Sequence, residues 1–492
     1  METKGRYLNK IKQDQIEKYL DDGKCFIDDD KIFKALNENK KTDASRVREI
    51  LAKSLAIEML SPDETAYLLN VDDEQLWQEM ADVASQVKKK VYDNRIVTFA
   101  PLYLSNLCVN DCLYCGFRRS NKDIKRIKLS LDEVRKETEV LAGEIGHKRL
   151  IVVYGEHPES DVDYIASTIE AIASVKVKTK NGFGQIRRSN VNAAPMSIED
   201  LKKLKAVGIG TFQVFQETYH RETYESVHPQ NTIKGNYLWR LYAMHRSMEA
   251  GCDDVGLGAL FGLYDWRYEV MALLYHSIEL EEKFGIGPHT ISFPRIEPAM
   301  NTPLAEKSVG KVSDENLRKL VIVLRLAVPY TGMILTARES AEIRRQILPL
   351  GCTQTDASSK IGIGTYCQKP GQQEEKQQFI LGDTSSLDSL IRELAEAGYI
   401  TSFCTAGYRC GRTGKKIMNL LKCGKEGQFC KLNAVITFRE WLDDFATEET
   451  KIAGERVIQK EIEEIKEQLP DWYPKLIEYY DKIKAGQRDI YF

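Results

Sequence analysis

Three cysteines lie within eight residues of one another in the stretch SNLCVNDCLYCGFRR, residues 105–119. They are Cys108, Cys112 and Cys115, and Tyr114 immediately precedes the last of them. A disulfide takes two cysteines, and structural zinc sites usually take four ligands that come as C-x2-C pairs. A [4Fe-4S] cluster held by only three thiolates leaves one iron open, which chemistry at a cluster requires. The spacing therefore indicates a cluster with an open iron, and a zinc loop with a remote fourth ligand is the alternative.

A second group of cysteines lies near the C-terminus: Cys404, Cys410, Cys423 and Cys430. Four thiols within 27 residues of a chain without an export signal indicate a second metal site, because thiolates in a reducing compartment ligate metals more often than they form disulfides. The alternative is that no metal binds there. The remaining cysteines are isolated, and we expect each to be a small buried apolar side chain: Cys25, Cys252, Cys352 and Cys367.

The composition is that of an ordinary globular protein of 492 residues, with 42% hydrophobic and 29% charged residues. The formal net charge of −3 gives no reason to expect nucleic acid or an acidic membrane surface as a partner. No run approaches the roughly 18 apolar residues that span a bilayer, and the N-terminal stretch METKGRYLNKIKQDQIEKYL lacks an apolar export signal. We expect a cytoplasmic protein.

The elements that must position these cysteines follow from the hydrophobic pattern. Residues 1–95 have apolar positions at helical spacing, and SPDE at 61–64 supplies an N-cap with an acidic first turn. From residue 96 to 370, strand-like runs alternate with amphipathic helical stretches. There are eight such runs: IVTFAPLYLS, RLIVVYGE, QIRRSNVNAA, GTFQVFQE, DDVGLGALFG, HTISFPR, GMILTARE and GCTQTDAS.

Eight strand–helix units predict parallel strands with right-handed crossovers, which close most economically as a (β/α)8 TIM-type barrel. We therefore expect an α/β protein with an N-terminal helical extension (1–95), a barrel (96–370) and a mostly helical C-terminal region that carries the second cysteine group (371–492). The polar stretch QKPGQQEEKQQF, from residue 368, is expected to be a linker or exposed loop.

Polar side chains gather at the C-terminal ends of the expected strands, where barrel enzymes place their chemistry. They are Gly155, Glu156, Asn190, Asn192, Gln216, Glu217, Arg295, Arg338 and Asp356. The three cysteines follow the first strand directly and are expected at the same mouth. Arg338 could hold a carboxylate by a bidentate contact, and a salt bridge at the barrel rim is the alternative.

The stretch Cys108-x3-Cys112-x-Tyr114-Cys115 resembles the C-x3-C-x-aromatic-C signature of the radical S-adenosylmethionine (SAM) superfamily. This resemblance implies that the open iron binds the amino and carboxylate groups of SAM. It also implies that one electron from the cluster cleaves the sulfonium to give a 5'-deoxyadenosyl radical, and that Tyr114 packs against the adenine.

Within that superfamily, residues 90–440 are similar to the HydG family, the tyrosine lyases that mature [FeFe]-hydrogenase, and to its relative ThiH. The similarity rests on FQETYHRETYESVHPQ, AGCDDVGLGALFGLYDW, GPHTISFPRIEPA and AVPYTGMILTARE. It implies cleavage of the Cα–Cβ bond of L-tyrosine to p-cresol and dehydroglycine. An electron donor such as ferredoxin or flavodoxin, and other maturation proteins, are the implied partners.

The same similarity assigns roles at the barrel mouth. Gly155 and Glu156 occupy the place of the family's loop at the amino group of SAM, and Glu217 and Asn190 are expected to face the ribose or the substrate. This loop reads VVYGEHP, where the family usually has AGED, and Asp356-Ala357-Ser358-Ser359 stands where the family reads SAGS.

The chain departs from HydG at the second cysteine group. HydG proteins carry a C-x2-C-x22-C motif there for a second cluster, at which dehydroglycine yields carbon monoxide and cyanide. Cys404 and Cys430 match the outer positions, but the middle position is Gly407. The family also offers a histidine for an extra iron three residues after LYH, where this chain has Glu279. Either Cys404, Cys410 and Cys430 hold an open cluster, or all four cysteines close it.

Three functions follow from these observations. The first is a HydG-like tyrosine lyase. The second is a divergent paralogue that acts on tyrosine or another amino acid for a different pathway and makes no cyanide. The third is a non-catalytic iron–sulfur carrier, which needs neither the aromatic residue before Cys115 nor the Gly155-Glu156 loop, and both are present.

Overall fold

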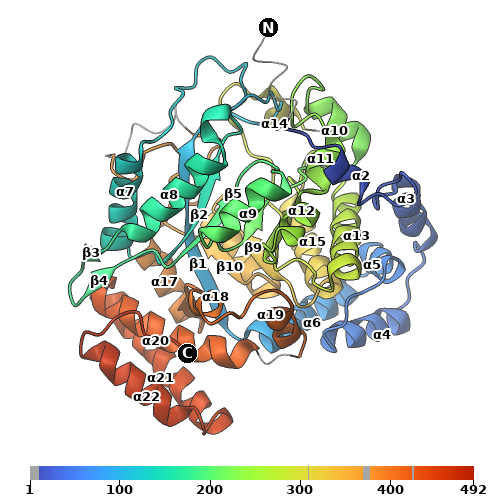
Figure 1. The fold of residues 1–492 in the computed structure, drawn as a ribbon. Helices are drawn as coiled ribbons and strands as arrows, with labels where there is room; N and C mark the ends of the chain where they lie inside the picture. Colours follow the sequence, from blue (N-terminus) through green and yellow to red (C-terminus); the bar gives the residue numbers. More distant parts are fainter. Residues whose placement is uncertain (1–9, 309, 369–376, 424–425) are drawn as a thin grey trace.

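The computed structural model describes residues 10–308, 310–368, 377–423 and 426–492. Its centre is a closed barrel of eight parallel strands, as the sequence predicts (Figure 1). The strands are β1 (Arg95–Ser105), β2 (Arg149–Tyr154), β5 (Arg188–Asn192), β6 (Phe212–Gln213), β7 (Val255–Gly258), β8 (Thr290–Ser292), β9 (Gly332–Leu335) and β10 (Gln354–Asp356). The barrel closes because β10 pairs with β1 in the register Val97↔Gln354.

Helices follow the strands and form the outer layer of the barrel, as right-handed crossovers require. They are α7 (Leu131–Glu139), α8 (Val162–Ser174), α9 (Ile198–Ala206), α10 (Arg221–Val227), α11 (Tyr237–Leu241), α12 (Ala243–Glu249), α13 (Trp266–Phe284), α14 (Pro303–Lys307), α15 (Asp314–Ala327) and α16 (Ala341–Ile347). A short hairpin, β3 (Val177–Lys178) with β4 (Phe183–Gly184), extends from the chain after α8.

The N-terminal extension is helical: α2 (Asp14–Glu17), α3 (Asp29–Glu38), α4 (Ala44–Leu55), α5 (Pro62–Leu69) and α6 (Glu74–Tyr92). Ser61 and Glu64 form a capping box that begins α5, in agreement with the SPDE signal. The extension packs on the barrel through α6 against α15 and α5 against α13. It therefore adds its core to that of the barrel.

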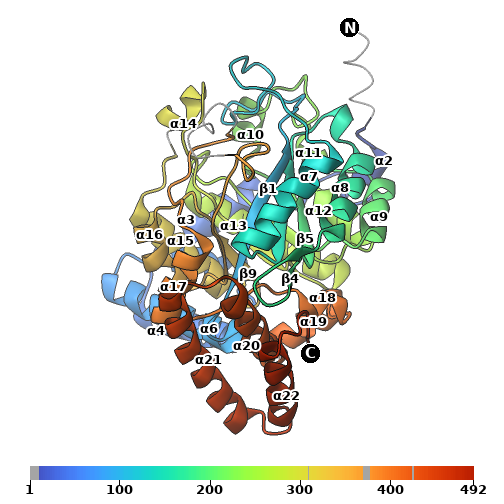
Figure 2. The ribbon, with the colours of Figure 1, turned by 90° about the vertical axis from the view of Figure 1, so that its left-hand side faces the viewer.

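The C-terminal region contains α17 (Leu387–Glu396), β11 (Ile400–Ser402), α18 (Ala406–Arg409), α19 (Gly414–Lys422), α20 (Glu426–Phe445), α21 (Glu448–Gln468) and α22 (Tyr473–Lys484). The sequence does not predict β11, which adds a ninth strand beside the first three residues of β1. Figures 1 and 2 show α20–α22 gathered at the end of the barrel where β1 begins. The C-terminal region is thus attached at the N-terminal end of the strands.

Buried charges join this region to the barrel. Glu440 on α20 pairs with Lys148 at 2.8 Å and with Arg187, and all three side chains are at most 3% exposed. Lys148 and Arg187 immediately precede strands β2 and β5. Removal of any one of these three groups would leave a buried charge without full compensation, which is strongly destabilising.

Two of the four isolated cysteines are buried as expected, Cys252 and Cys352. The expectation was wrong for Cys367, which is exposed, and Cys25 is only partly buried. The backbone N–H of Cys367 donates to the Glu137 carboxylate. The position of Cys367 therefore depends on a backbone hydrogen bond rather than on burial of its side chain. No helix among the described residues is long and apolar enough to cross a membrane.

Candidate active site at the barrel mouth

The loop that carries the three cysteines begins directly after β1 and is held by one arginine. The Arg126 guanidinium donates to the carbonyl oxygens of four residues of this loop and its base: Asn106, Phe117, Arg118 and Asn121. The backbone N–H of Val109 donates to the carbonyl of Glu156 at 2.8 Å, which ties the loop to the end of β2. Backbone contacts therefore fix the cysteines, and the side chains are left to face the barrel mouth.

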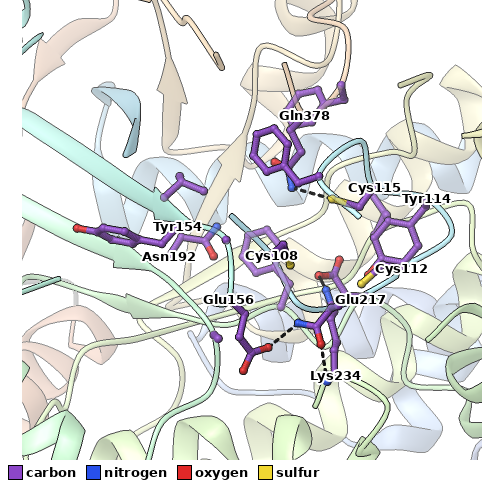
Figure 3. A pocket seen from close by; sticks show the side chains of 18 of the residues that line it. Cys108, Cys112, Tyr114, Cys115, Tyr154, Glu156, Asn192, Glu217, Lys234 and Gln378 are labelled. Carbon is purple, nitrogen blue, oxygen red and sulfur yellow. Dashed lines mark hydrogen bonds and ion pairs between the residues drawn. The ribbon is translucent and has the colours of Figure 1, made fainter. Parts of the chain in front are cut away.

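Cys108, Cys112 and Cys115 all line one cavity at the mouth (Figure 3). The cavity encloses about 1100 Å³ of atom-free space, part of which is open to solvent. Burial raises the pKa of the Cys108 thiol to about 11 and that of Cys112 to about 12. Thiols that resist ionisation so strongly need a bound cation to become thiolates, and an iron–sulfur cluster supplies that charge.

The spacing of the three thiols argues against a single zinc ion. Ligands of one tetrahedral zinc lie about 3.8 Å apart, since Zn–S bonds are about 2.3 Å long. In the described part of the chain, only one group of three metal-ligating atoms lies entirely within 4.8 Å, and it is Asp93, Glu461 and Glu464. Those carboxylates already surround the Lys431 ammonium. The three thiols at 108–115 thus do not form the compact group that a single tetrahedral zinc ion needs.

Tyr114 is oriented by a fully buried histidine, His228. Its hydroxyl lies 2.7 Å from Nε2 of His228, with the two rings nearly perpendicular. The Lys234 ammonium lies 5.4 Å from the centre of the Tyr114 ring. The aromatic face next to Cys115 is therefore fixed in direction, as a surface against which a planar group can pack needs to be.

Gly155 and Glu156 follow β2 and approach the cysteine loop closely. The backbone N–H of Gly155 donates to Ser105 at 2.8 Å, and a Cβ at Gly155 would lie 2.3 Å from the carbonyl oxygen of Leu107. Only glycine fits that approach. The Glu156 carboxylate accepts a hydrogen bond of 2.6 Å from the Asn110 amide. Burial raises the pKa of Glu156 and the Asn110 bond lowers it, with a net increase.

Glu217 lies opposite and is held by two cations. Its carboxylate pairs with Lys234 at 2.7 Å and with Arg240 at 3.1 Å. Burial raises the pKa of Glu217, but Lys234 and Arg240 outweigh it and lower the pKa, so the group is a carboxylate. Its backbone has φ of 73°, a conformation that a non-glycine residue adopts only when the surroundings enforce it.

Arg338 lines the same cavity and forms no ion pair with any described residue. The rim salt bridge that was the alternative belongs to Arg295, which pairs with Glu339 and Asp314. The Arg338 guanidinium stacks on Phe379 at 3.4 Å, and burial lowers its pKa. A partly exposed guanidinium that lines the cavity and forms no ion pair with a described residue is suited to bind a carboxylate.

The structure does not bring every expected residue to the cavity. Asn190 is fully buried below the mouth, where its side-chain oxygen accepts from the Thr211 backbone and the Arg188 side chain. Asn192, two residues later on β5, lines the cavity instead. Asp356 accepts hydrogen bonds from the Ala337 backbone and the Ser359 hydroxyl, so it holds the β9 and β10 loops.

Several residues of the cavity wall were not predicted from the sequence. Lys234 and Arg240 lie in the segment after β6, and no spacing marks them. Asn110 lies inside the cysteine motif, and its position between two ligands was the one available signal. Gln378 and Phe379 come from the stretch read as a linker, most of which (369–376) lies outside the described residues. The Gln378 side-chain oxygen accepts a hydrogen bond from the Tyr103 hydroxyl at 3.0 Å, and its amide nitrogen donates to Cys115 Sγ at 3.5 Å.

The second cysteine group lies at the opposite end of the barrel. Cys404 follows β11, and the Arg188 guanidinium, at the start of β5, donates to its carbonyl at 3.1 Å and lies 3.7 Å from its Sγ. Cys404 and Cys430 line one small cavity together with Gly407. The Tyr408 ring covers Arg188 at 3.4 Å.

The other two C-terminal cysteines do not line that cavity. The Cys410 thiol donates to the carbonyl of Phe492 at 3.3 Å, and Cys423 is exposed at the end of α19, where its thiol donates to Leu420. Glu279, the residue at the family's histidine position, pairs with His245 and Lys283 and does not line the cavity either. The ligand set of four thiols stays a prediction.

Comparisons with known proteins agree with this geometry. The Radical SAM superfamily model matches residues 102–274, and the Biotin and Thiamin Synthesis associated domain matches residues 292–400. The crystal structure of a HydG, a maturase of the [FeFe]-hydrogenase, is 48% identical in sequence with a TM-score of 0.89, and the match covers 95% of this chain and all of that one. The chain belongs to the HydG family of radical SAM enzymes.

Two further relatives place this radical SAM enzyme in the same group. HydG from Carboxydothermus hydrogenoformans is 35% identical with a TM-score of 0.75, over 97% of this chain and 99% of the other. The 2-iminoacetate synthase of Escherichia coli K12 is 30% identical over 74% of this chain and 90% of its own length. As a radical SAM enzyme, the protein uses a [4Fe-4S] cluster with SAM and needs a reductant.

Proposed function

We propose that this radical SAM enzyme is a carbon–carbon lyase that cleaves the Cα–Cβ bond of L-tyrosine to p-cresol and dehydroglycine. The observation that carries the proposal is one cavity that gathers the three cysteines, Tyr114, Glu156 and Arg338 in a chain 48% identical to a HydG. When bound, the cluster and SAM supply one-electron cleavage of the sulfonium and a 5'-deoxyadenosyl radical that abstracts hydrogen from the substrate.

The chain's own residues bind and orient the two ligands. Cys108, Cys112 and Cys115 hold the cluster. Glu156 is kept in place by Asn110 and faces the amino group of SAM. The corresponding loop has this role in the family that the chain resembles. Tyr114 offers its ring to the adenine.

The remaining wall binds the amino acid. Arg338 has no anionic partner among the described residues and is placed to bind the substrate carboxylate in a bidentate manner. Glu217, ionised between two cations, faces the ribose or the substrate amino group. Asn192, which lines the cavity, is proposed to face the ribose or the substrate, the role that the sequence analysis gave to Asn190.

We propose that the C-terminal cysteines bind a second iron–sulfur cluster. Cys404 and Cys430 share a cavity, and Cys410, at the end of the short helix that contains Gly407, is the proposed third thiolate. Ferredoxin or flavodoxin is the proposed electron donor, with other maturation proteins as further partners.

A specific observation favours a second candidate, a paralogue that cleaves tyrosine but makes no cyanide or carbon monoxide. Gly407 lines the cavity at the place of the family's middle cysteine, and Glu279 is engaged by His245 and Lys283. Both departures concern the step after tyrosine cleavage. The radical site at the other end of the barrel is complete without them.

Anaerobic reconstitution with iron and sulfide, followed by SAM, dithionite and L-tyrosine, tests both candidates. 5'-Deoxyadenosine, p-cresol, cyanide and carbon monoxide are measured in the same reaction. All four products support a HydG activity, and p-cresol without cyanide or carbon monoxide supports the paralogue. Formation of 5'-deoxyadenosine without p-cresol refutes the tyrosine assignment, and absence of 5'-deoxyadenosine refutes the radical chemistry.

A further inference from the structure

Two apolar side chains are exposed beside the cysteine loop. Leu113, between Cys112 and Tyr114, is 39% exposed, and Ile380 is 61% exposed. Only six large hydrophobic side chains are this exposed in the described part of the chain, and two of them lie here. Exposed apolar side chains scattered singly need no explanation, but here one lies between two cysteines of the motif and the other lies two residues after Gln378, which contacts Cys115.

Both side chains belong to the shell that directly covers the cluster ligands. The Leu113 backbone N–H donates to the carbonyl of Val227 at 3.1 Å, so this residue is fixed between Cys112 and Cys115 with its side chain outward. Two residues before Ile380, Gln378 accepts from the Gly116 backbone at 3.3 Å and approaches Cys115 Sγ at 3.5 Å. Figure 3 shows Gln378 over Cys115. A molecule seated on these residues would be separated from the cluster by one layer of protein.

The surrounding loop is strongly basic, although the whole chain is slightly acidic. Residues 111–128 contain six cations and two acids, a net charge of +4, against −3 for the chain. Arg126 is used inside the loop, where it binds carbonyl oxygens, and Lys128 lies over the Tyr164 ring. The cations that remain at the surface are Arg118, Arg119, Lys122 and Lys125.

These surface cations are largely without acidic partners. Arg119 lies 3.7 Å from Asp111, a weak pair. Arg118, Lys122 and Lys125 form no ion pair within the described residues, and Lys122 and Lys125 are exposed. Cations without acidic partners on one exposed loop give a positive potential that attracts an acidic protein and steers its approach.

We propose that this surface docks a small acidic electron-carrier protein that reduces the cluster. The cluster-loop surface is defined here as Leu113, Ile380, Arg118, Arg119, Lys122 and Lys125. The proposal rests on the proposed function, because only a cluster that must be reduced requires such a partner. One electron leaves the reduced carrier and enters the oxidised cluster, so the carrier is oxidised by one electron for each SAM that is cleaved.

The composition of the surface favours this occupant over a permanent subunit. Electron-transfer encounters are small and short-lived, and charge at the rim sets their rate of association more than their strength. Two exposed apolar side chains are too few for the core of an obligate interface, whereas four cations on one surface loop suit rapid and salt-sensitive association with an acidic partner.

The test compares a protein donor with a small-molecule donor. The Lys122→Glu/Lys125→Glu variant is reconstituted with iron and sulfide beside the wild type, and 5'-deoxyadenosine formation is driven either by reduced flavodoxin or by dithionite. The matched control is Lys178→Glu/Lys180→Glu, the same charge change on the exposed β3–β4 hairpin, whose Asn181 bonds Asp444 of α20 near the other end of the barrel. Ile380→Asp tests the apolar centre independently.

The expected result is a flavodoxin-driven rate about tenfold or more below wild type at low salt for Lys122→Glu/Lys125→Glu, with an unchanged dithionite-driven rate. The difference should shrink at high salt, and the hairpin control should behave as wild type. An unchanged flavodoxin-driven rate, an equal fall with dithionite, or an equal fall in the control would overturn the docking surface.

The proposed function has a separate readout. If wild-type enzyme with dithionite forms no 5'-deoxyadenosine, the proposed function fails. Calorimetric titration of flavodoxin into the reconstituted proteins still decides the surface in that case: weaker binding to Lys122→Glu/Lys125→Glu than to the hairpin control supports it, and equal binding overturns it.

Discussion

Replacement of Asn110 by alanine should weaken the binding of SAM. Asn110 is 2% exposed and connects opposite walls of the cavity: its amide donates to Glu156 at 2.6 Å, and its oxygen accepts from the Lys234 backbone at 3.1 Å. Among the contacts that lower the pKa of Glu156, the hydrogen bond from Asn110 has the largest effect. A hydrogen bond to a charged group contributes about 1.5–3 kcal/mol. If Glu156 binds the SAM amino group, that loss converts to a fall in affinity of about 10- to 150-fold.

The assay is dithionite-driven 5'-deoxyadenosine formation over a range of SAM concentrations, with iron content measured on the same samples. The KM for SAM should rise at least about tenfold, while kcat at saturating SAM changes less, because the cysteines themselves are untouched. Asn121→Ala is the matched control, since Asn121 is a buried asparagine of the same loop that donates only to the carbonyls of Gly116 and Met300. An unchanged KM for Asn110→Ala at full iron content, or an equal rise for Asn121→Ala, would refute the reasoning.

Three further predictions concern other parts of the molecule. Gly155→Ala should lower 5'-deoxyadenosine formation more than about tenfold while the circular dichroism spectrum stays native. The added Cβ would lie 2.3 Å from the Leu107 carbonyl oxygen and displace the backbone just before the cysteine loop. A wild-type rate would contradict this prediction. Burial raises the pKa of Glu440, but Lys148 and Arg187 outweigh it and lower the pKa from 4.5 to about 2, so about 3 kcal/mol of stability is present above pH 4.5 and is lost as the pH falls toward 2. Denaturant titrations at pH 7 and pH 3 should show about 2 kcal/mol of that loss in wild type and a much flatter dependence in Glu440→Gln. Cys410→Ser should reduce the iron bound per chain by about four, against little change for the exposed Cys423→Ser; equal iron loss in both would indicate a cluster closed by four thiols.

The sequence predicts most of the radical site because its residues lie at the ends of strands. The carboxyl ends of parallel strands meet at one mouth, so Cys108 after β1, Glu156 after β2 and Arg338 after β9 had to come together once the barrel was recognised. Depth along a strand is harder to predict. Asn190 and Asn192 point to the same face, but Asn190 lies about 6–7 Å lower, where Arg188 and Thr211 already use its side chain.

The rest of the site carries no periodic signal. Lys234 and Arg240 lie on a segment whose spacing marks neither residue, and only the folded chain shows that both reach Glu217. Gln378 belongs to a stretch whose polar composition is typical of a linker, yet it covers Cys115. Strand β11 is three residues long, too short for alternation to reveal it, and its pairing with β1 depends on residues 300 positions away.

The attachment of the C-terminal region through β11 has a consequence for how such enzymes diversify. The cavity of the three cysteines and the cavity of Cys404 and Cys430 have no lining residue in common among those described. One is built from the last residues of the barrel strands, and the other lies beside their first. Substitutions in the C-terminal cavity, such as glycine at position 407, therefore leave every described lining residue of the cysteine cavity at the barrel mouth unchanged. The length of the barrel strands separates the radical site from the C-terminal cysteine site, so the two sites can change independently.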